Sequence, residues 1–150
     1  MNQADRVRTI LMVDDDRDDC LLVRDALAEV PGCYDLRFVG DGEELFEYLG
    51  RVGRFTQPHE APHPELILLD LRMPRKDGRE ALRELKNDCR WRRIPVVVLT
   101  TSTAEDDVRY AYEQGVNSYI TKPTTFRTLV DSVRLLSRYW FELVQGPPVE

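Results

Sequence analysis

Acidic side chains follow two apolar segments of the chain, in a pattern that suits the binding of a divalent cation. Asp14 and Asp15 directly follow residues 10–13, and Asp70 directly follows residues 66–69. Two unit charges about 4 Å apart repel by roughly 4 kcal/mol at an effective dielectric constant of about 20, so carboxylates that gather at one place require a counterion. Carboxylate oxygens without a supporting His or Cys are hard ligands, which favour Mg²⁺ over zinc. The pattern therefore predicts a magnesium site.

Two further apolar segments are followed by side chains that suit contact with a phosphoryl group. Thr100 follows residues 96–99, and Lys122 follows residues 118–121. Lysine supplies a compact positive charge and threonine a hydroxyl donor, so together with a divalent cation they would surround the oxygens of a phosphoryl group. A carboxylate that attacks phosphorus forms a mixed anhydride, which needs charge neutralisation and positioning more than it needs a general base. We therefore expect Asp70 to accept a phosphoryl group.

Five short apolar segments, rich in branched side chains, would position these groups. They are residues 10–13, 36–39, 66–69, 96–99 and the weaker 118–121. Segments that are apolar on both faces are typical of parallel strands buried under helices, whereas half-exposed antiparallel strands alternate apolar and polar residues. The pattern indicates a parallel sheet.

Helical spacing of apolar residues separates these strands. Stripes at spacings of three and four predict helices around residues 20–30, 45–49, 81–85 and 108–112. The strongest stripe predicts a last helix from about Thr125 to Leu143. Strictly alternating strands and helices of this length force right-handed crossovers. We therefore predict an α/β fold of five βα units, with a doubly wound, five-stranded parallel sheet and helices on both faces.

Ligands of an open parallel sheet bind beyond the carboxyl ends of its strands, so this fold would bring the two acidic segments together with Lys122. Taken alone, residues 14–16 could cap the first helix, and Lys122 could be an ordinary surface lysine. Strand ends seldom collect such charges without a functional reason. The shared edge therefore favours a site for Asp14 and Asp15 and leaves capping to Asp16.

Composition and charge exclude several classes of protein. The 150 residues suit one compact domain. The chain has 21 Lys and Arg against 27 Asp and Glu, and its formal net charge of −6 disfavours nucleic acid and anionic membrane as partners. Its three cysteines are odd in number and lack Cys-x-x-Cys spacing, so a reducing cytoplasm is the simplest setting. No apolar run approaches the length of about 18 residues that would span a bilayer.

The segment 53–65 contains three prolines, and we expect an extended surface connection there. His59 and His63 lie four residues apart, as two metal ligands on a helix would. The prolines around them prevent that helix, so we expect no metal site in this segment.

From about residue 8 to residue 137 the sequence resembles the receiver domains of two-component response regulators, which have the flavodoxin-like fold. The matching motifs are ILMVDDD, LILLDLRMPRKDG, PVVVLTT and SYITKP, in the family's order and spacing. The resemblance implies that residues 1–150 form a single receiver domain with an extended C-terminal helix and a short tail. No output domain would be present.

The resemblance implies how the expected site works. Asp70 would receive a phosphoryl group from a histidine kinase. Asp14, Asp15 and Asp70, together with the backbone carbonyl of Arg72, would hold Mg²⁺. The chain would be a phosphoacceptor and not an enzyme, with at most self-phosphorylation from small phosphodonors and self-dephosphorylation.

The resemblance also implies a conformational switch. Lys122 would contact the phosphoryl group, Thr100 would move toward it, and Tyr119 would turn inward behind Thr100. The phosphoryl oxygens would thereby bias an equilibrium that exists before phosphorylation. Without this context, Tyr119 is simply a packing side chain. The bond between Lys122 and Pro123 would be cis.

A narrower resemblance is to the phytochrome-associated members of this family. They share the long connection between the second and third strands, the TKP segment before a long last helix, and an aromatic cluster near its end, here Tyr139, Trp140 and Phe141. A phytochrome-type kinase would then be the partner. Large aromatic side chains dominate interface energetics, so we expect a homodimer through the face of the fourth helix, fifth strand and fifth helix.

Three alternative functions compete with this one. A haloacid-dehalogenase-type phosphatase also uses a strand-end Asp with Mg²⁺, but it needs a second Asp two residues later, where this chain has Arg72. A flavodoxin-like cofactor binder would need a phosphate loop after the first strand, where residues 14–16 would repel phosphate. A receiver-fold adaptor that signals without phosphorylation would not need the complete set of site residues found here.

Overall fold

A computed structural model describes residues 6–148 as five strands and five α-helices in strict alternation. The strands are β1 (Arg8–Val13), β2 (Tyr34–Val39), β3 (Leu66–Leu69), β4 (Val96–Thr100) and β5 (Ser118–Thr121). The α-helices are α1 (Arg17–Ala28), α2 (Gly42–Gly50), α3 (Gly78–Asn87), α4 (Glu105–Glu113) and α5 (Phe126–Arg138). Each predicted strand and helix is present, and β1 and β2 begin two residues earlier than their apolar segments.

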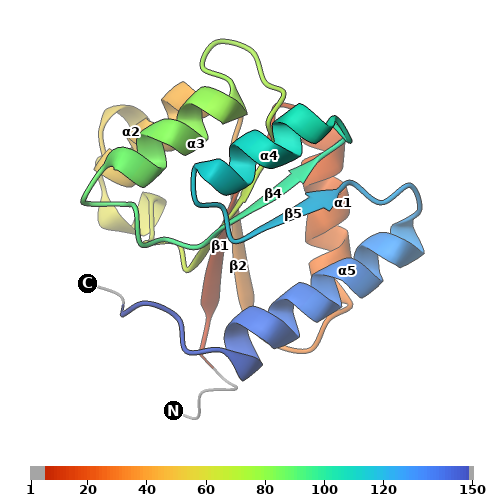
Figure 1. Cartoon of the computed structure of the whole chain (residues 1–150). Coiled ribbons are helices and arrows are strands. Elements are labelled where there is room, and N and C mark those ends of the chain that lie inside the picture. The colour runs from red at the N-terminus through yellow and green to blue at the C-terminus, as the bar shows by residue number, and fades with distance from the viewer. Residues whose placement is uncertain (1–5, 149–150) are drawn as a thin grey trace.

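The strands form one parallel sheet in the order β2-β1-β3-β4-β5. Helices α1 and α5 cover one face, and α2, α3 and α4 cover the other (Figure 1). The predicted doubly wound fold is therefore confirmed. Order reverses between β1 and β3, so the carboxyl ends of these two strands flank the place where such sheets bind ligands.

Alternate residues of the central strands pack into two separate cores. In β1, Leu11 and Val13 face the core under α2, α3 and α4, whereas Ile10 and Met12 face the core under α1 and α5. Successive side chains of a strand point to opposite faces of the sheet, so a strand covered on both sides must be apolar throughout. This explains why the strand segments do not alternate apolar and polar residues.

Polar side chains define where most of the helices begin. Asp16, Asp41, Asp77 and Thr125 are N-caps of α1, α2, α3 and α5, and each side chain accepts a backbone N–H of the first turn. Such caps satisfy donors that have no partner within the helix. The expected capping by Asp16 is confirmed. Beyond α4, Gly115 has a φ of 92°, which favours glycine and ends the helix there.

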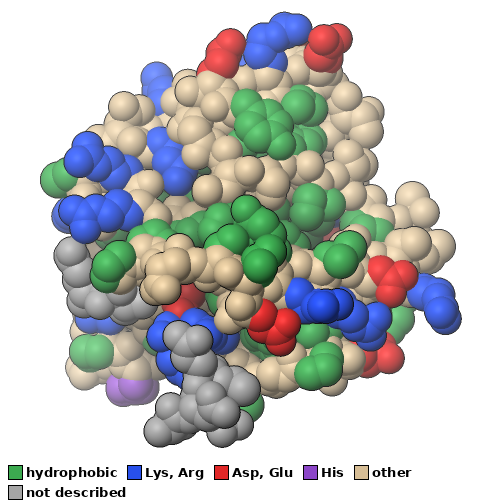
Figure 2. Space-filling view, turned by 60° about the horizontal axis from the view of Figure 1, so that its bottom comes forward, with side chains coloured by type: hydrophobic (Ala, Val, Ile, Leu, Met, Phe, Trp, Pro, Cys, Tyr) green, Lys and Arg blue, Asp and Glu red, His purple; other side chains and the backbone are tan. Residues whose placement is uncertain are grey.

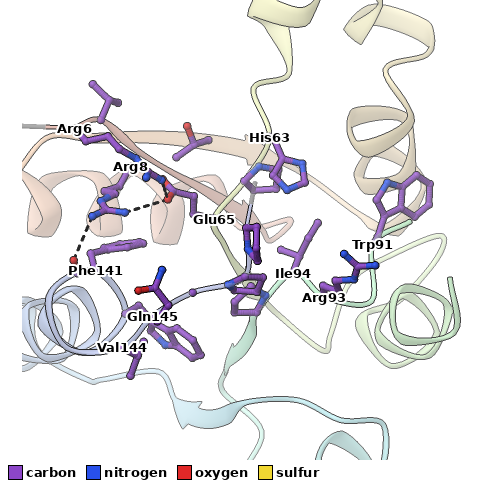
Figure 3. Close-up of a pocket in the computed structure, with 18 of the residues that line it drawn as sticks. Arg6, Arg8, His63, Glu65, Trp91, Arg93, Ile94, Phe141, Val144 and Gln145 are labelled. Atoms are coloured by element: carbon purple, nitrogen blue, oxygen red, sulfur yellow. Dashed lines mark hydrogen bonds and ion pairs between the residues drawn. The ribbon is translucent and has the colours of Figure 1, made fainter. Parts of the chain in front are cut away.

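The last helix changes its geometry near its end. The α-helix stops at Arg138, and Tyr139–Leu143 form a π-helical turn, η4. The predicted end of the last helix at Leu143 is confirmed, although its last turn is π-helical. The carbonyl of Phe141 in this turn accepts a hydrogen bond of 3.3 Å from the guanidinium of Arg8 on β1 (Figure 3). The same guanidinium pairs with Glu65. These contacts hold the end of the last helix beside the start of the sheet.

The segment 53–65 is not simply extended. It contains two short 3-10 turns, η2 (Gly53–Phe55) and η3 (Pro58–Glu60). Phe55 is buried with its ring edge-on to Tyr48 of α2, at 5.2 Å between centroids, and the Tyr48 hydroxyl donates to the carbonyl of Pro62 over 2.7 Å. Burial of one aromatic ring fixes the segment against α2, so the prediction of an extended connection is wrong here. In the described part of the chain, no helix has the length and apolar character needed to cross a membrane.

Candidate functional site

The carboxyl ends of two neighbouring strands carry buried carboxylates. Val13 at the end of β1 and Leu69 at the end of β3 are partners in the parallel ladder. Asp14 and Asp70 follow them, and the backbone N–H of Asp70 donates to the carbonyl of Val13 over 2.9 Å. Both side chains are buried. The sheet register therefore places the two acidic segments side by side.

Asp14, Asp15 and Asp70 fit a divalent cation. One oxygen from each carboxylate lies within 4.8 Å of the other two. Oδ2 of Asp14 is buried and pairs with the ammonium of Lys122 at 2.7 Å, but it accepts no well-aligned hydrogen bond, so it keeps a lone pair that a divalent cation would satisfy. Burial raises the pKa of Asp14 to about 6, although Lys122 and the backbone N–H of Asp16 lower it. Hard oxygen donors without a nitrogen or sulfur ligand select a cation such as Mg²⁺ or Mn²⁺.

Lys122 follows β5 and supplies the positive charge of the site. Its Nζ lies 2.7 Å from Oδ2 of Asp14, 2.6 Å from Oδ2 of Asp19 and 3.5 Å from Oδ2 of Asp70. Burial by itself would lower the pKa of Lys122, but its close contacts with the carboxylates of Asp14 and Asp19 outweigh burial and raise this pKa above its usual value. The ammonium group therefore stays charged and offsets part of the repulsion among the carboxylates.

Thr100 on β4 and Tyr119 on β5 reach different partners. The hydroxyl of Thr100, which is fully buried at the end of β4, donates to Oδ1 of Asp70 over 2.7 Å. The hydroxyl of Tyr119 on β5 donates to the backbone carbonyl of Ser102 over 2.8 Å, and its ring is half-buried. Burial raises the pKa of Tyr119, which stays a neutral donor. Thr100 therefore contacts Asp70 directly, whereas Tyr119 is held by the loop after β4.

The backbone and the side chain of Arg72 contact different acidic residues. Its backbone N–H donates to Oδ1 of Asp70 over 3.2 Å. Its guanidinium pairs instead with Asp107 of α4, at 2.6 Å. Gly78 brings α3 close to the same loop, because a Cβ at this position would lie 2.0 Å from the carbonyl oxygen of Asp70. Only glycine permits this close approach of two backbones.

Two features of this region differ from the sequence-based expectations. No peptide bond of the described residues is cis, so the prediction of a cis bond between Lys122 and Pro123 is wrong. Asp19, which the sequence analysis did not single out, pairs closely with Lys122. The contact of Asp19 with Lys122 could have been predicted from the place of Asp19 in the first turn of α1, because that turn begins at the same sheet edge as Asp14.

The aromatic cluster at the end of α5 divides between two surroundings. Phe141 is half-buried, with its ring 6.0 Å from that of Tyr34 and 5.3 Å from the guanidinium of Arg8. Tyr139 and Trp140 instead line a shallow apolar groove beside β5 and α5. Figure 2, which turns this end of the molecule toward the viewer, shows apolar side chains gathered between Lys and Arg side chains.

A large hollow lies away from the acidic cluster, and its lining contains none of Asp14, Asp15 and Asp70. It has a volume of about 990 Å³ and is lined by the start of β1, by the segments before β3 and β4, and by the chain after α5. Figure 3 shows Arg8, Glu65 and Phe141 on one side of it and His63, Trp91 and Arg93 on the other. Asp14 and Asp70 lie at the carboxyl ends of the strands, so this hollow is not part of their site.

The site's chemistry follows from its charges. Asp70 is a buried carboxylate whose oxygens are held by the hydroxyl of Thr100 and the backbone N–H of Arg72 and face the ammonium of Lys122. A carboxylate fixed in this way is an oriented nucleophile. Positive charge around it would stabilise the oxygens of a transferring phosphoryl group.

Comparison with known proteins gives a consistent result. The family model described as "Response regulator receiver domain" matches residues 10–134. The chain is 39% identical to "Response regulator Rcp1" from a Synechocystis species, over 97% of this chain and 97% of the relative.

Two solved structures share both fold and sequence with this chain. One is described as the phosphorylated cyanobacterial phytochrome response regulator RcpA, with a TM-score of 0.87 and 39% identity over 95% of this chain and all of the other. The other is the Mn²⁺-bound form of response regulator Rcp1, with a TM-score of 0.84 and 40% identity over 94% of this chain and 99% of the other. At these identities the likeness extends beyond the fold to the family.

Proposed function

Because the chain belongs to the response regulator receiver domain family, we propose that Asp70 accepts a phosphoryl group from a histidine kinase and that the chain relays this signal through protein contacts. Receiver domains of this family pair with histidine kinases and are generally not enzymes in the usual sense. One observation supports the assignment of Asp70 most directly. Its buried carboxylate lies beside Asp14 and Asp15, with Oγ1 of Thr100 at 2.7 Å and Nζ of Lys122 at 3.5 Å.

Mg²⁺ would be held by Asp14, Asp15 and Asp70, with the backbone carbonyl of Arg72 as a further ligand. The buried Oδ2 of Asp14, which lacks an aligned donor, supports this assignment. The Mn²⁺ in the structure of Rcp1 supports a divalent cation in a similar protein. When bound, the ion would neutralise negative charge on the carboxylates and on the phosphoryl oxygens.

The transfer needs few groups from this chain. An ionised oxygen of Asp70 attacks phosphorus, the bond from phosphorus to the kinase histidine nitrogen breaks, and that nitrogen keeps the electron pair. The product is a mixed anhydride on Asp70. The ammonium of Lys122 moves to the phosphoryl oxygens and balances the charge that they bring.

The structure supplies the starting point of a switch. The hydroxyl of Thr100 now donates to Asp70. Once Asp70 carries a phosphoryl group, the same hydroxyl donates to a phosphoryl oxygen, and Thr100 is drawn toward the site. Tyr119 then leaves the carbonyl of Ser102 and fills the space behind Thr100. Because the phosphoryl oxygens favour only this arrangement, they shift a pre-existing equilibrium.

The kinase that we propose is a bacteriophytochrome-type kinase. The support is the likeness to RcpA, which is described as a phytochrome response regulator. We also propose that residues 1–150 form a single receiver domain and that it acts in the cytoplasm. Its self-phosphorylation from small phosphodonors and its self-dephosphorylation would be its only chemical activities.

A homodimer through the α4-β5-α5 face is a second proposal. β5 is an edge strand, and Leu135 on α5 is 68% exposed beside the groove that Tyr139 and Trp140 line. Leu135→Arg would place a charge in this interface, so equilibrium ultracentrifugation should then show monomers. Leu22→Arg, at an exposed position of α1, should leave the dimer intact. A wild-type chain that stays monomeric at high micromolar concentration, with and without a phosphoryl mimic, would contradict the dimer.

Phosphorylation itself is tested by mass. Incubation with Mg²⁺ and acetyl phosphate is expected to add one phosphoryl group to the intact chain, and Asp70→Asn is expected to add none. Asp77→Asn is the matched control, because Asp77 lies in the same loop and caps α3. No gain in the wild type, or a gain that survives Asp70→Asn, rejects Asp70 as the acceptor.

A further inference from the structure

The hollow of Figure 3 lies near the amino ends of the strands, and the proposed phosphoryl transfer makes no use of it. Its volume of about 990 Å³ falls within the range of small-molecule sites, which is about 300–1,000 Å³. Among the described residues, four arginines and two glutamates line it, with no Asp and no Lys. The formal charge of the lining is therefore positive, although that of the whole chain is −6. A positive, concave surface on an acidic protein favours an anionic ligand.

Two arginines on one wall of the hollow share a single carboxylate. The guanidiniums of Arg6 and Arg8 both pair with Glu65, that of Arg8 at 3.1 Å. Within residues 6–148, neither guanidinium forms an ion pair with a second carboxylate. This wall therefore carries more positive than negative charge. The side chain of Arg6 is 46% exposed, so an anion in the hollow can reach it.

Arg8 holds this wall in place. Its side chain is 13% exposed, and its guanidinium donates to the backbone carbonyl of Phe141 over 3.3 Å. The same guanidinium lies 5.3 Å from the centre of the Phe141 ring. Groups that are fixed before a ligand arrives lose little conformational freedom when it binds. The wall is therefore preorganised for an anion.

The segment before β4 supplies the opposite wall. Figure 3 shows Trp91 and Arg93 across the hollow from Arg8, and Arg90 lines the same wall. The guanidinium of Arg90 lies 4.0 Å from the centre of the Trp91 ring and pairs with Asp88 at 2.8 Å. Its side chain is 65% exposed, and an ion pair at the surface contributes little to stability. Arg90 can therefore turn from Asp88 to a ligand.

We propose that this hollow binds a small molecule that carries a chain of phosphoryl groups. Guanidinium groups bind phosphoryl oxygens through paired hydrogen bonds. A carboxylate presents two oxygens in one plane, whereas each phosphorus of a phosphate chain presents oxygens on several sides. A chain of phosphoryl groups therefore suits arginines that approach from two walls better than a carboxylate does. The hollow shares no residue with the acidic cluster, so its ligand can be tested separately from phosphoryl transfer to Asp70.

Two exposed cysteines allow a test that reports where the ligand binds. Cys89 lines the hollow, whereas Cys33, just before β2, does not. The full chain is treated with N-ethylmaleimide in the presence of tripolyphosphate, ATP or adenosine, and alkylation of each cysteine is followed by peptide mass. EDTA is included, so that no Mg²⁺ carries phosphate to the acidic cluster.

Tripolyphosphate and ATP should slow the alkylation of Cys89 at least about threefold when present at twice their Kd or more, and adenosine should not. Alkylation of Cys33 should stay unchanged. Tighter binding of ATP than of tripolyphosphate would identify a nucleotide as the ligand, and equal binding would identify the phosphate chain alone. Absence of protection, equal protection of both cysteines, or equal protection by adenosine would overturn the proposal. A peptide of four glutamates that protects Cys89 at lower concentration than tripolyphosphate would overturn it in favour of an acidic protein partner.

Arginine variants test the two walls. Arg6→Gln and Arg90→Gln should each weaken the binding of tripolyphosphate about fivefold or more, because each removes a charge-assisted contact. Arg24→Gln is the matched control, since Arg24 lies on α1 outside the hollow and its side chain is 59% exposed. Its affinity should equal that of the wild type. Wild-type affinity in both wall variants would overturn the proposal.

Tryptophan fluorescence provides the affinities in these variants. The chain has two tryptophans, and both Trp91 and Trp140 line the hollow. Tripolyphosphate should therefore change the emission of the wild type, and the change should weaken as the salt concentration rises. Asp70→Asn should respond as the wild type does. Loss of the response in Asp70→Asn would place the phosphate chain at the acidic cluster and overturn the proposal.

Discussion

Lys122, just beyond β5, lies with its Nζ 2.6 Å from Oδ2 of Asp19 in the first turn of α1. The same ammonium lies 2.7 Å from Asp14 after β1. One charge therefore connects an edge strand, a central strand and a helix at the carboxyl end of the sheet. Lys122 thus offsets the repulsion among the carboxylates that gather at this edge.

Lys122→Ala should destabilise the fold and make it more dependent on a cation. It leaves Asp14 and Asp70 buried without their counterion, and removal of one partner from a buried ion pair costs about 3 kcal/mol or more of unfolding free energy. Mg²⁺ supplies a replacement charge, so in urea unfolding it should stabilise the variant more than the wild type. Lys76→Ala is the control, because Lys76 pairs with the exposed Glu84. Equal effects of Mg²⁺ on all three proteins would argue against a shared cation site.

Thr100→Val should separate phosphorylation from the switch. Valine fills the buried position but cannot donate to Asp70, which costs about 1 kcal/mol of stability. Asp70 should still gain a phosphoryl group in the mass assay. The NMR signal of the Tyr119 ring, assigned with Tyr119→Phe, should no longer shift on phosphorylation. Thr101→Val, at the exposed next position, should behave as the wild type. An unchanged Tyr119 response in Thr100→Val would contradict the switch.

Gly78→Ala should distort the loop that carries Asp70. The added Cβ would meet the Asp70 carbonyl at 2.0 Å and the Leu71 Cα at 2.5 Å, so one backbone must move. Overpacking of this kind costs about 1–3 kcal/mol, and the rate of phosphorylation should fall with it. Gly50→Ala, where a Cβ meets nothing within 4 Å, should keep both stability and rate. Normal phosphorylation of Gly78→Ala would show that the loop tolerates the shift.

Asp41→Ala should lower stability at neutral pH but not in acid. Burial would raise the pKa of Asp41, but the N–H of Glu44 and the guanidinium of Arg75 outweigh it and lower this pKa below 3.8. A carboxylate with a lowered pKa contributes stability above its unfolded pKa and loses it as pH falls through the folded pKa. The variant should therefore lose about 1 kcal/mol near pH 7, and the difference in Tm from the wild type should shrink below pH 3.8.

Glu43→Ala provides the comparison for this pH series, because Glu43 lies in the same turn of α2 and is half exposed. Its Tm should stay close to that of the wild type at every pH. A difference between Asp41→Ala and the wild type that persists unchanged to pH 3 would mean that the charge of Asp41 contributes nothing.

The sequence by itself determined the strands, the helices and the edge at which the site forms. Apolar residues at both faces of the strand segments indicated a covered parallel sheet, because a strand buried on two sides is mostly apolar on both faces. Given that sheet, Asp14, Asp70 and Lys122 had to meet, since the carboxyl ends of parallel strands lie at one edge. Each of these predictions depends on the spacing of apolar residues along the chain, which can be read directly from the sequence.

Only the tertiary structure decided which charges pair. The chain has 27 Asp and Glu, and nothing local distinguishes Asp19 or Asp107 from the exposed acids beside them. Their partners, Lys122 and Arg72, come from other elements, and the contacts form because α1 and α4 pack on the sheet at particular distances. A side chain's ion-pair partner is set by separations of a few ångströms between segments far apart in sequence, and hydrophobic periodicity does not encode those separations.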